Sequence, residues 1–332
     1  MHPMTDEQAL AGFDVRLDPW AAEYGSETPT DFHSDPDESA EVDVGVERGT
    51  WTPIAPATVE PPRALAIVDG VRRIEARLVI TRNGRVFHGA LGSYGVGVVR
   101  CADGRARFGE ELRGRVVIFG AGEQLPAPLV VSPGLVYEPR TVGEDDPDGP
   151  VRGLHSEMRR AEEQFARELA SDPELLVLAD GPLNFGDATA GRVVGFVKRL
   201  FKLYLPAEQL SLLRSLPWRM RTPVFLIRSE GRFSRYSWFI RIADRLPVES
   251  AFTGLVRLEV SDGVGLEEAV RLANLTTTIV PGFVSSRGRD PRAPQNLVPI
   301  GALEQHLRRG LGDARLIRRR LATLLSRQIA HA

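Results

Sequence analysis

Apolar and polar positions along this chain form two kinds of pattern, which together predict a mixed α/β fold. Short aliphatic runs bounded by turn formers are typical of strands that are buried on both faces. Consecutive strands in the first half, followed by alternating helices and strands, indicate a mixed sheet with helices on both of its faces. Strands are predicted at residues 64–69, 74–81, 85–91, 94–101, 115–119, 128–132, 175–180, 223–228, 236–242 and 254–260.

Helices are indicated by apolar residues that recur every three or four positions. The clearest case is residues 151–170, where such residues form a single face. That face consists of Leu154, Met158, Ala161, Phe165 and Leu169. Further helices are predicted at residues 190–205, 207–216, 266–280, 300–310 and 313–330, with a proline-rich loop at 281–299.

The first 60 residues differ from the rest of the chain in composition. They are acidic, rich in Pro, Ser and Thr, and show little apolar periodicity. Such a segment buries too little apolar surface to offset its ordering entropy. We therefore expect residues 1–60 to form a mostly disordered acidic arm and residues 61–332 to form the folded domain.

The net charge of −2 hides an asymmetry between the two ends of the chain. Residues 1–62 hold fourteen acidic and two basic residues, so the remainder is basic, and arginine dominates there. Because arginine suits bidentate phosphate contacts, a basic body of this kind favours a nucleic-acid substrate. The alternative is that the arginine content reflects a GC-rich genome.

Composition also excludes several classes of protein. The single cysteine, Cys101, rules out an internal disulfide and a cysteine-based zinc cluster. No apolar stretch reaches the roughly 20 residues that span a bilayer. The N-terminus lacks the basic and apolar regions of a signal peptide. These features predict a cytoplasmic protein without a membrane segment.

Two aspartates each follow a buried apolar run and precede a glycine. They are Asp69 and Asp180, and an aspartate at the end of such a strand points into the crevice at the sheet edge. Glu162 lies on the flank of the apolar face of the helix at 151–170, from which it can lean toward both aspartates. Three carboxylates in one place predict a site for one or two Mg²⁺ or Mn²⁺ ions. The alternative is a solvated helix face and two strand-ending turns.

Four sequence blocks add a family resemblance to this pattern. They read IVDGVRR at 67–73, DGPL at 180–183, VGFVK at 194–198 and DPRAPQNLVPI at 290–300. In this order the blocks resemble the NurA family of DNA nucleases over residues 63–312. The resemblance implies an RNase H-like mixed sheet flanked by helices, with β-rich and helical insertions. It also implies metal-dependent exo- and endonuclease activity, a HerA-type hexameric ATPase as partner, and a homodimer.

The resemblance extends to single residues. Asp69 and Asp180 match the two aspartates of the family's metal site, and Glu162 resembles its helix glutamate. Glu163 or Glu157 would match that glutamate after a small shift. Val71 stands where the family often has serine, so a hydroxyl contact is absent at that point.

Residues further along the chain are candidates for phosphate or metal contacts. Lys198, on the helix predicted at 190–205, is expected to contact a DNA phosphate together with Lys202. Asp290 is a candidate fourth, outer metal ligand. Gln295 and Asn296 are candidates to bind phosphates or to orient water. The alternatives are a solvated helix face for the lysines and loop capping for the other three residues.

Three functional readings follow from these features. The first is a divalent-metal-dependent DNA nuclease that acts in end processing, repair or defence. The second is a non-catalytic adaptor of the same fold that binds DNA and an ATPase. The third is a nucleotide-handling enzyme that uses the glycine-rich segment at 92–97, although no helix is predicted to follow that segment. His306, on the predicted helix at 300–310, is either a proton carrier or a structural residue.

Overall fold

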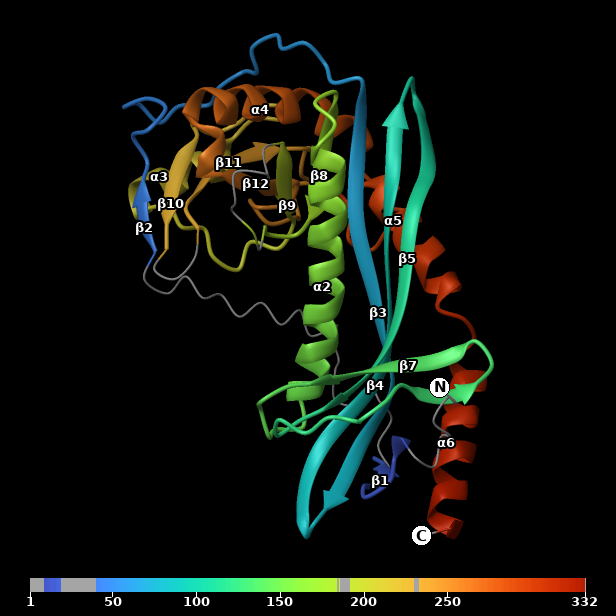
Figure 1. The fold of residues 1–332 in the computed structure, drawn as a ribbon. Coiled ribbons are helices and arrows are strands. Elements are labelled where there is room, and N and C mark those ends of the chain that lie inside the picture. The colour runs from blue at the N-terminus through green and yellow to red at the C-terminus, as the bar shows by residue number, and fades with distance from the viewer. Residues whose placement is uncertain (1–8, 19–39, 184, 186–191, 230–232, 332) are drawn as a thin grey trace.

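The structure is a computed structural model that describes residues 9–18, 40–183, 185, 192–229 and 233–331. A twelve-stranded mixed sheet runs through these residues (Figure 1). Across the sheet the strands are β2 (Glu41–Asp43), β10 (Phe225–Arg228), β11 (Arg235–Arg241), β12 (Leu255–Ser261), β9 (Val193–Val197), β8 (Leu175–Asp180), β3 (Ala64–Arg82), β4 (Arg85–Ala102), β5 (Arg105–Phe119), β7 (Leu135–Thr141) and β6 (Leu129–Ser132), and β1 (Asp14–Leu17) pairs with β3.

Helices flank this sheet, as the sequence pattern predicted. They are α2 (Gly149–Ala170), α3 (Ala207–Ser215), α4 (Leu266–Ile279), α5 (Val298–Gly310) and α6 (Ala314–His331), with the short 3₁₀ helices η2 (Asp262–Val264) and η3 (Val280–Phe283). Strand β8 pairs in parallel with β3 and β9, and β5 pairs in parallel with β7. The pairs β3–β4, β4–β5, β9–β12 and β11–β12 are antiparallel. The expected mixed α/β sheet with flanking helices is therefore confirmed.

Two helices cover opposite faces of β3 and β4 (Figure 1). Val68 packs with Met158 of α2 in one core cluster, whereas Ile67 packs with Leu303 of α5 in another. Successive side chains of a strand point to opposite faces of the sheet. The alternation consequently puts Asp69 on the face that α5 covers.

The strands around Asp69 are longer than the sequence pattern predicted. β3 spans both of the strands expected at 64–69 and 74–81, with a bulge between Ile74 and Ala76. Asp69 therefore does not end its strand. The pairing of β3 with β8 does end there, at Val68 opposite Ala179, because β8 stops at Asp180. The open space beside Asp69 therefore arises because the neighbouring strand β8 ends at Asp180, and not because β3 itself ends.

The prediction of a helix at 190–205 is wrong for residues 192–205, the part of this range that the structure describes. Residues Val193–Val197 form strand β9, and no helix follows before Ala207 among the described residues. All five residues of β9 are buried, and the strand pairs with β8 on one side and β12 on the other. A fully buried run rich in valine packs better in the interior of a sheet than on a helix. Lys198 consequently follows the end of strand β9 directly, and does not lie on a helix.

The described parts of residues 1–60 do not lie apart from the body, in contrast to the expected arm. Phe13 and Val15 are buried in a core cluster, and β1 pairs with β3. Further along, β2 pairs with β10, and Glu47 forms an ion pair with Arg221. Apolar residues in this acidic segment find partners on the sheet that its local pattern did not reveal. Residues 1–8 and 19–39 lie outside the described part of the chain.

Among the described residues, no helix combines the length and the apolar character needed to cross a membrane.

Candidate metal centre

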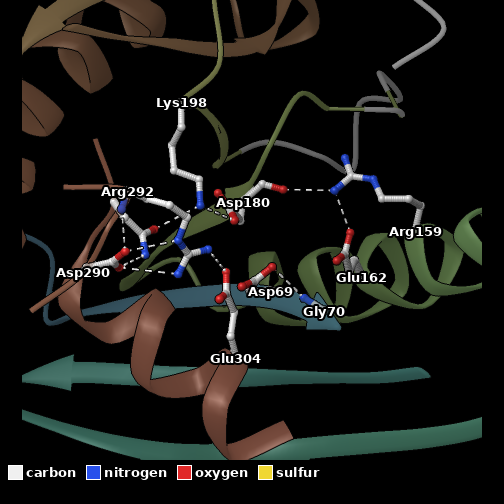
Figure 2. A network of polar contacts seen from close by, with 10 residues as sticks. Asp69, Gly70, Arg159, Glu162, Asp180, Lys198, Asp290, Arg292 and Glu304 are labelled. Carbon is white, nitrogen blue, oxygen red and sulfur yellow. Dashed lines mark hydrogen bonds and ion pairs between the residues drawn. The ribbon is translucent and has the colours of Figure 1, made fainter. Parts of the chain in front are cut away.

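Three carboxylates from three elements meet beside the edge that β8 leaves open. They belong to Asp69 of β3, Asp180 at the end of β8 and Glu304 of α5 (Figure 2). One oxygen atom from each lies within 4.8 Å of the others. The parallel register of β3 and β8 brings the two aspartates together, and the packing of α5 on β3 adds the glutamate. We call these three residues the carboxylate cluster.

The carboxylate cluster contains buried oxygen atoms without a hydrogen-bond partner. Asp69 is 5% exposed; its Oδ1 accepts a hydrogen bond from the Gly70 amide at 2.8 Å, but its Oδ2 has no partner among the described residues. Asp180 Oδ1 is likewise buried and without a partner there. An unsatisfied buried acceptor costs free energy, more so when it is charged. Hard divalent cations such as Mg²⁺ and Mn²⁺ are ligated by such oxygens, so the residues present fit such an ion.

The electrostatics of the carboxylate cluster also favour a cation. Burial raises the pKa of Asp69 well above its usual value, and the negative charges of Asp180, Glu304 and Glu162 raise it further, against the opposing effect of Lys198. Like charges in a dry site cannot all ionise without compensation. A divalent cation would supply that compensation.

Lys198 compensates part of this charge. Its Nζ donates hydrogen bonds to Asp180 Oδ2 at 2.6 Å and to Asn296 Oδ1 at 3.0 Å. Burial by itself would lower the pKa of Lys198, but Asp180 and Asp69 raise the pKa above its ordinary value. The ammonium group is therefore charged and lies within the site.

Asp290 does not join the carboxylate cluster. Its Oδ2 accepts a hydrogen bond from Asn296 Nδ2 at 2.6 Å, and Arg292 forms an ion pair with its Oδ1 at 3.3 Å. Burial favours a higher pKa for Asp290, but these hydrogen bonds outweigh it and lower the pKa. The same guanidinium donates to Glu304 Oε1 at 2.5 Å. The carboxylate of Asp290 thus contacts Arg292 and Asn296, which lie next to the carboxylate cluster, and is not part of the cluster itself.

Glu162 lies beside the cluster but has another partner. It is 6% exposed, and Arg159 Nη1 donates to its Oε2 at 2.6 Å. Arg159 also donates to the backbone carbonyls of Asp180 at 3.0 Å and Pro182 at 2.6 Å (Figure 2). The carboxylate of Glu162 abuts Gly70, the residue whose side-chain position faces α2, so it reaches β3 from the face opposite to Asp69.

Two other glutamates of α2, Glu157 and Glu163, pair with arginines outside the site. Glu157 Oε2 accepts from Arg140 at 3.0 Å, and Glu163 Oε1 lies 2.6 Å from Arg167. Of the three glutamates that the sequence left open, Glu162 is thus the one whose negative charge helps to raise the pKa of Asp69.

Three further candidates make contacts elsewhere. Lys202 Nζ lies 5.1 Å from the ring centre of Tyr204, and Gln295 donates to the carbonyl of Phe252 at 3.5 Å. His306 Nε2 donates a hydrogen bond to Glu111 Oε2 at 2.9 Å, and its ring stacks on that of Phe108. None of these contacts involves the carboxylate cluster.

The glycine-rich segment at 92–97 lies inside β4 and serves close packing. A Cβ atom at Gly97 would lie 3.1 Å from Leu307 Cδ2 of α5. At Gly92 a Cβ atom would collide with Leu154 of α2. These glycines let both helices approach the strand, which explains them without a bound nucleotide.

Glu304 is the site residue that the sequence reasoning missed. The available signal was the apolar period of Ile300, Leu303 and Leu307, all of which are buried. Glu304 lies on the flank of that face, as Glu162 does on α2. The flank position alone does not say which strand the helix covers. The pattern of α5 therefore could not show that Glu304 lies next to Asp69 and Asp180.

No protein-family model matches the chain, and no curated protein matches it. Among solved structures, the chain is similar to the NurA nuclease from Sulfolobus solfataricus, with 12% identity over 77% of this chain and 81% of that chain and a TM-score of 0.44. It is also similar to the catalytic domain of human endonuclease V, with 17% identity over 76% of this chain and 85% of that chain and a TM-score of 0.34.

Proposed function

We propose that this protein is a divalent-metal-dependent DNA nuclease of RNase H-like fold. The observation that carries the proposal is a pair of buried oxygens, Asp69 Oδ2 and Asp180 Oδ1, for which the described part of the chain offers no hydrogen-bond partner and which lie within a cluster completed by Glu304. Buried carboxylate oxygens of this kind indicate a cation that binds from solvent.

The chemistry assigned to the site is phosphodiester hydrolysis. One or two Mn²⁺ or Mg²⁺ ions, when bound, would supply a Lewis acid that activates water and neutralises charge developing at phosphorus. Asp69, Asp180 and Glu304 would hold the metal. Glu162 is a further proposed ligand because its buried carboxylate adds negative charge around Asp69. Lys198 would contact the phosphate, since its ammonium group lies against the cluster.

The sequence resemblance extends this proposal to a biological role. It suggests exo- or endonucleolytic processing of DNA ends, in repair or in defence, by a cytoplasmic homodimer that works with a HerA-like hexameric ATPase. The basic composition of the chain after residue 62 supports a DNA substrate. We also propose that residues 61–332 form the nuclease domain, to which the described parts of the N-terminal segment are attached through β1 and β2.

The proposal is tested by cleavage of end-labelled single- and double-stranded DNA with Mn²⁺, Mg²⁺ or EDTA. We expect metal-dependent cleavage that falls about 100-fold or more in Asp69→Asn and Asp180→Asn. A matched pair on one helix is Glu162→Gln against Glu163→Gln. The first variant should lose activity, and the second should retain it because Glu163 pairs with Arg167.

Three outcomes distinguish the readings. Cleavage that survives in both aspartate variants, with folding intact by circular dichroism, would refute the carboxylate assignment. A wild-type protein that binds DNA and the ATPase but never cleaves would favour the adaptor. Cleavage that needs the ATPase and is lost in Asp69→Asn would identify a nuclease that its partner activates.

A further inference from the structure

Two positively charged side chains, those of Lys198 and Arg292, contact the carboxylate cluster. Lys198 Nζ lies 2.6 Å from Asp180 Oδ2, and Arg292 Nη1 lies 2.5 Å from Glu304 Oε1 (Figure 2). The side chain of Lys198 is 18% exposed and that of Arg292 is 43% exposed. Each cation binds a different carboxylate of the cluster. The third carboxylate, that of Asp69, accepts a hydrogen bond from the backbone amide of Gly70.

Both cations rest on a common support in the loop that precedes α5. Asn296, which is fully buried, accepts from Lys198 and donates to Asp290. Asp290 in turn forms the ion pair with Arg292. The contacts therefore run in an unbroken chain from Asp180 through the support to Glu304, and the two ends of that chain meet again in the carboxylate cluster.

The charge balance explains why this support exists. Three carboxylates within 4.8 Å of one another repel strongly in a partly buried site, unless cations lie beside them. Lys198 and Arg292 supply two positive charges there. They leave Asp69 Oδ2 and Asp180 Oδ1 without a partner among the described residues, so the site is only partly neutralised.

We propose that Lys198 and Arg292 are internal counter-ions of the carboxylate cluster, which a divalent cation displaces. Before the cation binds, they hold Asp180 and Glu304 in place. Once it binds, their attraction to these carboxylates falls, and both side chains become available to a DNA phosphate, which ammonium and guanidinium groups bind well. In this arrangement Asp290 and Asn296 are positioning residues. The inference rests on the proposed metal site.

The proposed counter-ion role predicts that two substitutions increase the affinity for Mn²⁺ and do not decrease it. A positive charge beside a cation site opposes the incoming cation, so removing it should tighten metal binding. We expect Lys198→Gln and Arg292→Gln to bind Mn²⁺ about tenfold more tightly than wild type. If the two side chains merely supported the carboxylates, the same changes would weaken Mn²⁺ binding.

The experiment is isothermal titration of the full chain with Mn²⁺ in the absence of DNA. Lys202→Gln is the matched control, because it removes a nearby lysine that lies against Tyr204 and should change the Mn²⁺ affinity less than about twofold. Lys198→Arg retains the charge and should bind Mn²⁺ like wild type. Lys198→Met provides a second neutral variant if Lys198→Gln does not fold.

The outcomes separate this inference from the proposed function. Tighter Mn²⁺ binding in the neutral variants supports the counter-ion role. Unchanged or weaker binding in them overturns it, while loss of binding in Asp69→Asn and Asp180→Asn would still support the metal site. If those two aspartate variants bind Mn²⁺ like wild type, the metal site itself is refuted and the counter-ion role falls with it.

Discussion

Two buried groups of charged side chains in this protein differ in how completely their polar atoms are paired. In the first group, Arg221 is 1% exposed, and its two terminal nitrogens each lie 2.8 Å from an oxygen of Glu47. Its third nitrogen donates to Asn274 at 2.9 Å, and Glu47 also accepts from the amide of Val224 at 2.6 Å. Every side-chain nitrogen and oxygen of this ion pair thus has a partner.

The carboxylate cluster has the opposite character. It gathers three acids, and two of its oxygens are buried without a partner in the described part of the chain. The difference teaches what each group does. A fully paired buried ion pair cannot accept a ligand and serves to position its elements, whereas a partly paired one retains a binding capacity that costs stability.

The largest expected effect comes from breaking the paired group. Glu47→Gln leaves the Arg221 guanidinium buried without its counter-charge, which should lower the free energy of unfolding by about 3–5 kcal/mol. Urea denaturation followed by circular dichroism measures this. The control is Glu41→Gln, whose carboxylate is 77% exposed and 3.6 Å from Arg228, and which should change stability by less than about 1 kcal/mol. A small effect of Glu47→Gln would show that the two groups do not differ as argued.

A smaller effect of opposite sign is expected in the unpaired group. Asp69→Asn removes a buried charge that Asp180 and Glu304 repel, and replaces it with a neutral amide that can donate a hydrogen bond. In EDTA the free energy of unfolding should stay unchanged or rise by about 1 kcal/mol, while nuclease activity is lost. Thermal and urea unfolding of the metal-free protein measure it. A loss as large as that of Glu47→Gln would identify Asp69 as a structural partner.

The smallest expected effect is a pH dependence of the paired group. Burial favours a higher pKa for Glu47, but the hydrogen bonds and charge of Arg221 and the amide of Val224 outweigh it and lower the pKa below 4.5. A depressed carboxylate pKa contributes stability that is present above the unfolded value and is lost as the pH falls through the folded value. The stability gap between wild type and Glu47→Gln should therefore be constant from pH 7 to 5.5 and shrink toward pH 3. Urea unfolding at each pH measures it, and a gap that widens on acidification would contradict the assignment.

Local patterns were sufficient for most elements and for two site residues. The apolar period of α2 and the aliphatic run of β8 are visible in the sequence, and both elements occur where expected. Asp69 and Asp180 were found because each follows a buried run directly. Their meeting depends on one tertiary fact, the parallel pairing of β3 with β8.

Local patterns failed where a neighbour in space decided the outcome. Residues 193–197 are apolar enough for either a helix or a strand, and strands on both sides made them β9. The acidic N-terminal segment contributes Glu47 to a buried ion pair because Arg221, 174 positions away, needs its charge. Asp290 was a candidate outer metal ligand in the sequence, and in the structure Arg292 and Asn296 contact its carboxylate.

The sequence by itself indicated that Asp69 and Asp180 would lie close together, since each directly follows a buried aliphatic run, although only β8 ends at its aspartate while β3 continues past Asp69. Tertiary structure alone decided which further carboxylate joins them. The alternation of β3 directs Asp69 to the face of α5, so Glu304 completes the cluster and Glu162 reaches the strand from the other face. The physical reason is that the face of a strand is a local property, whereas the helix that covers it is chosen by packing over the whole chain.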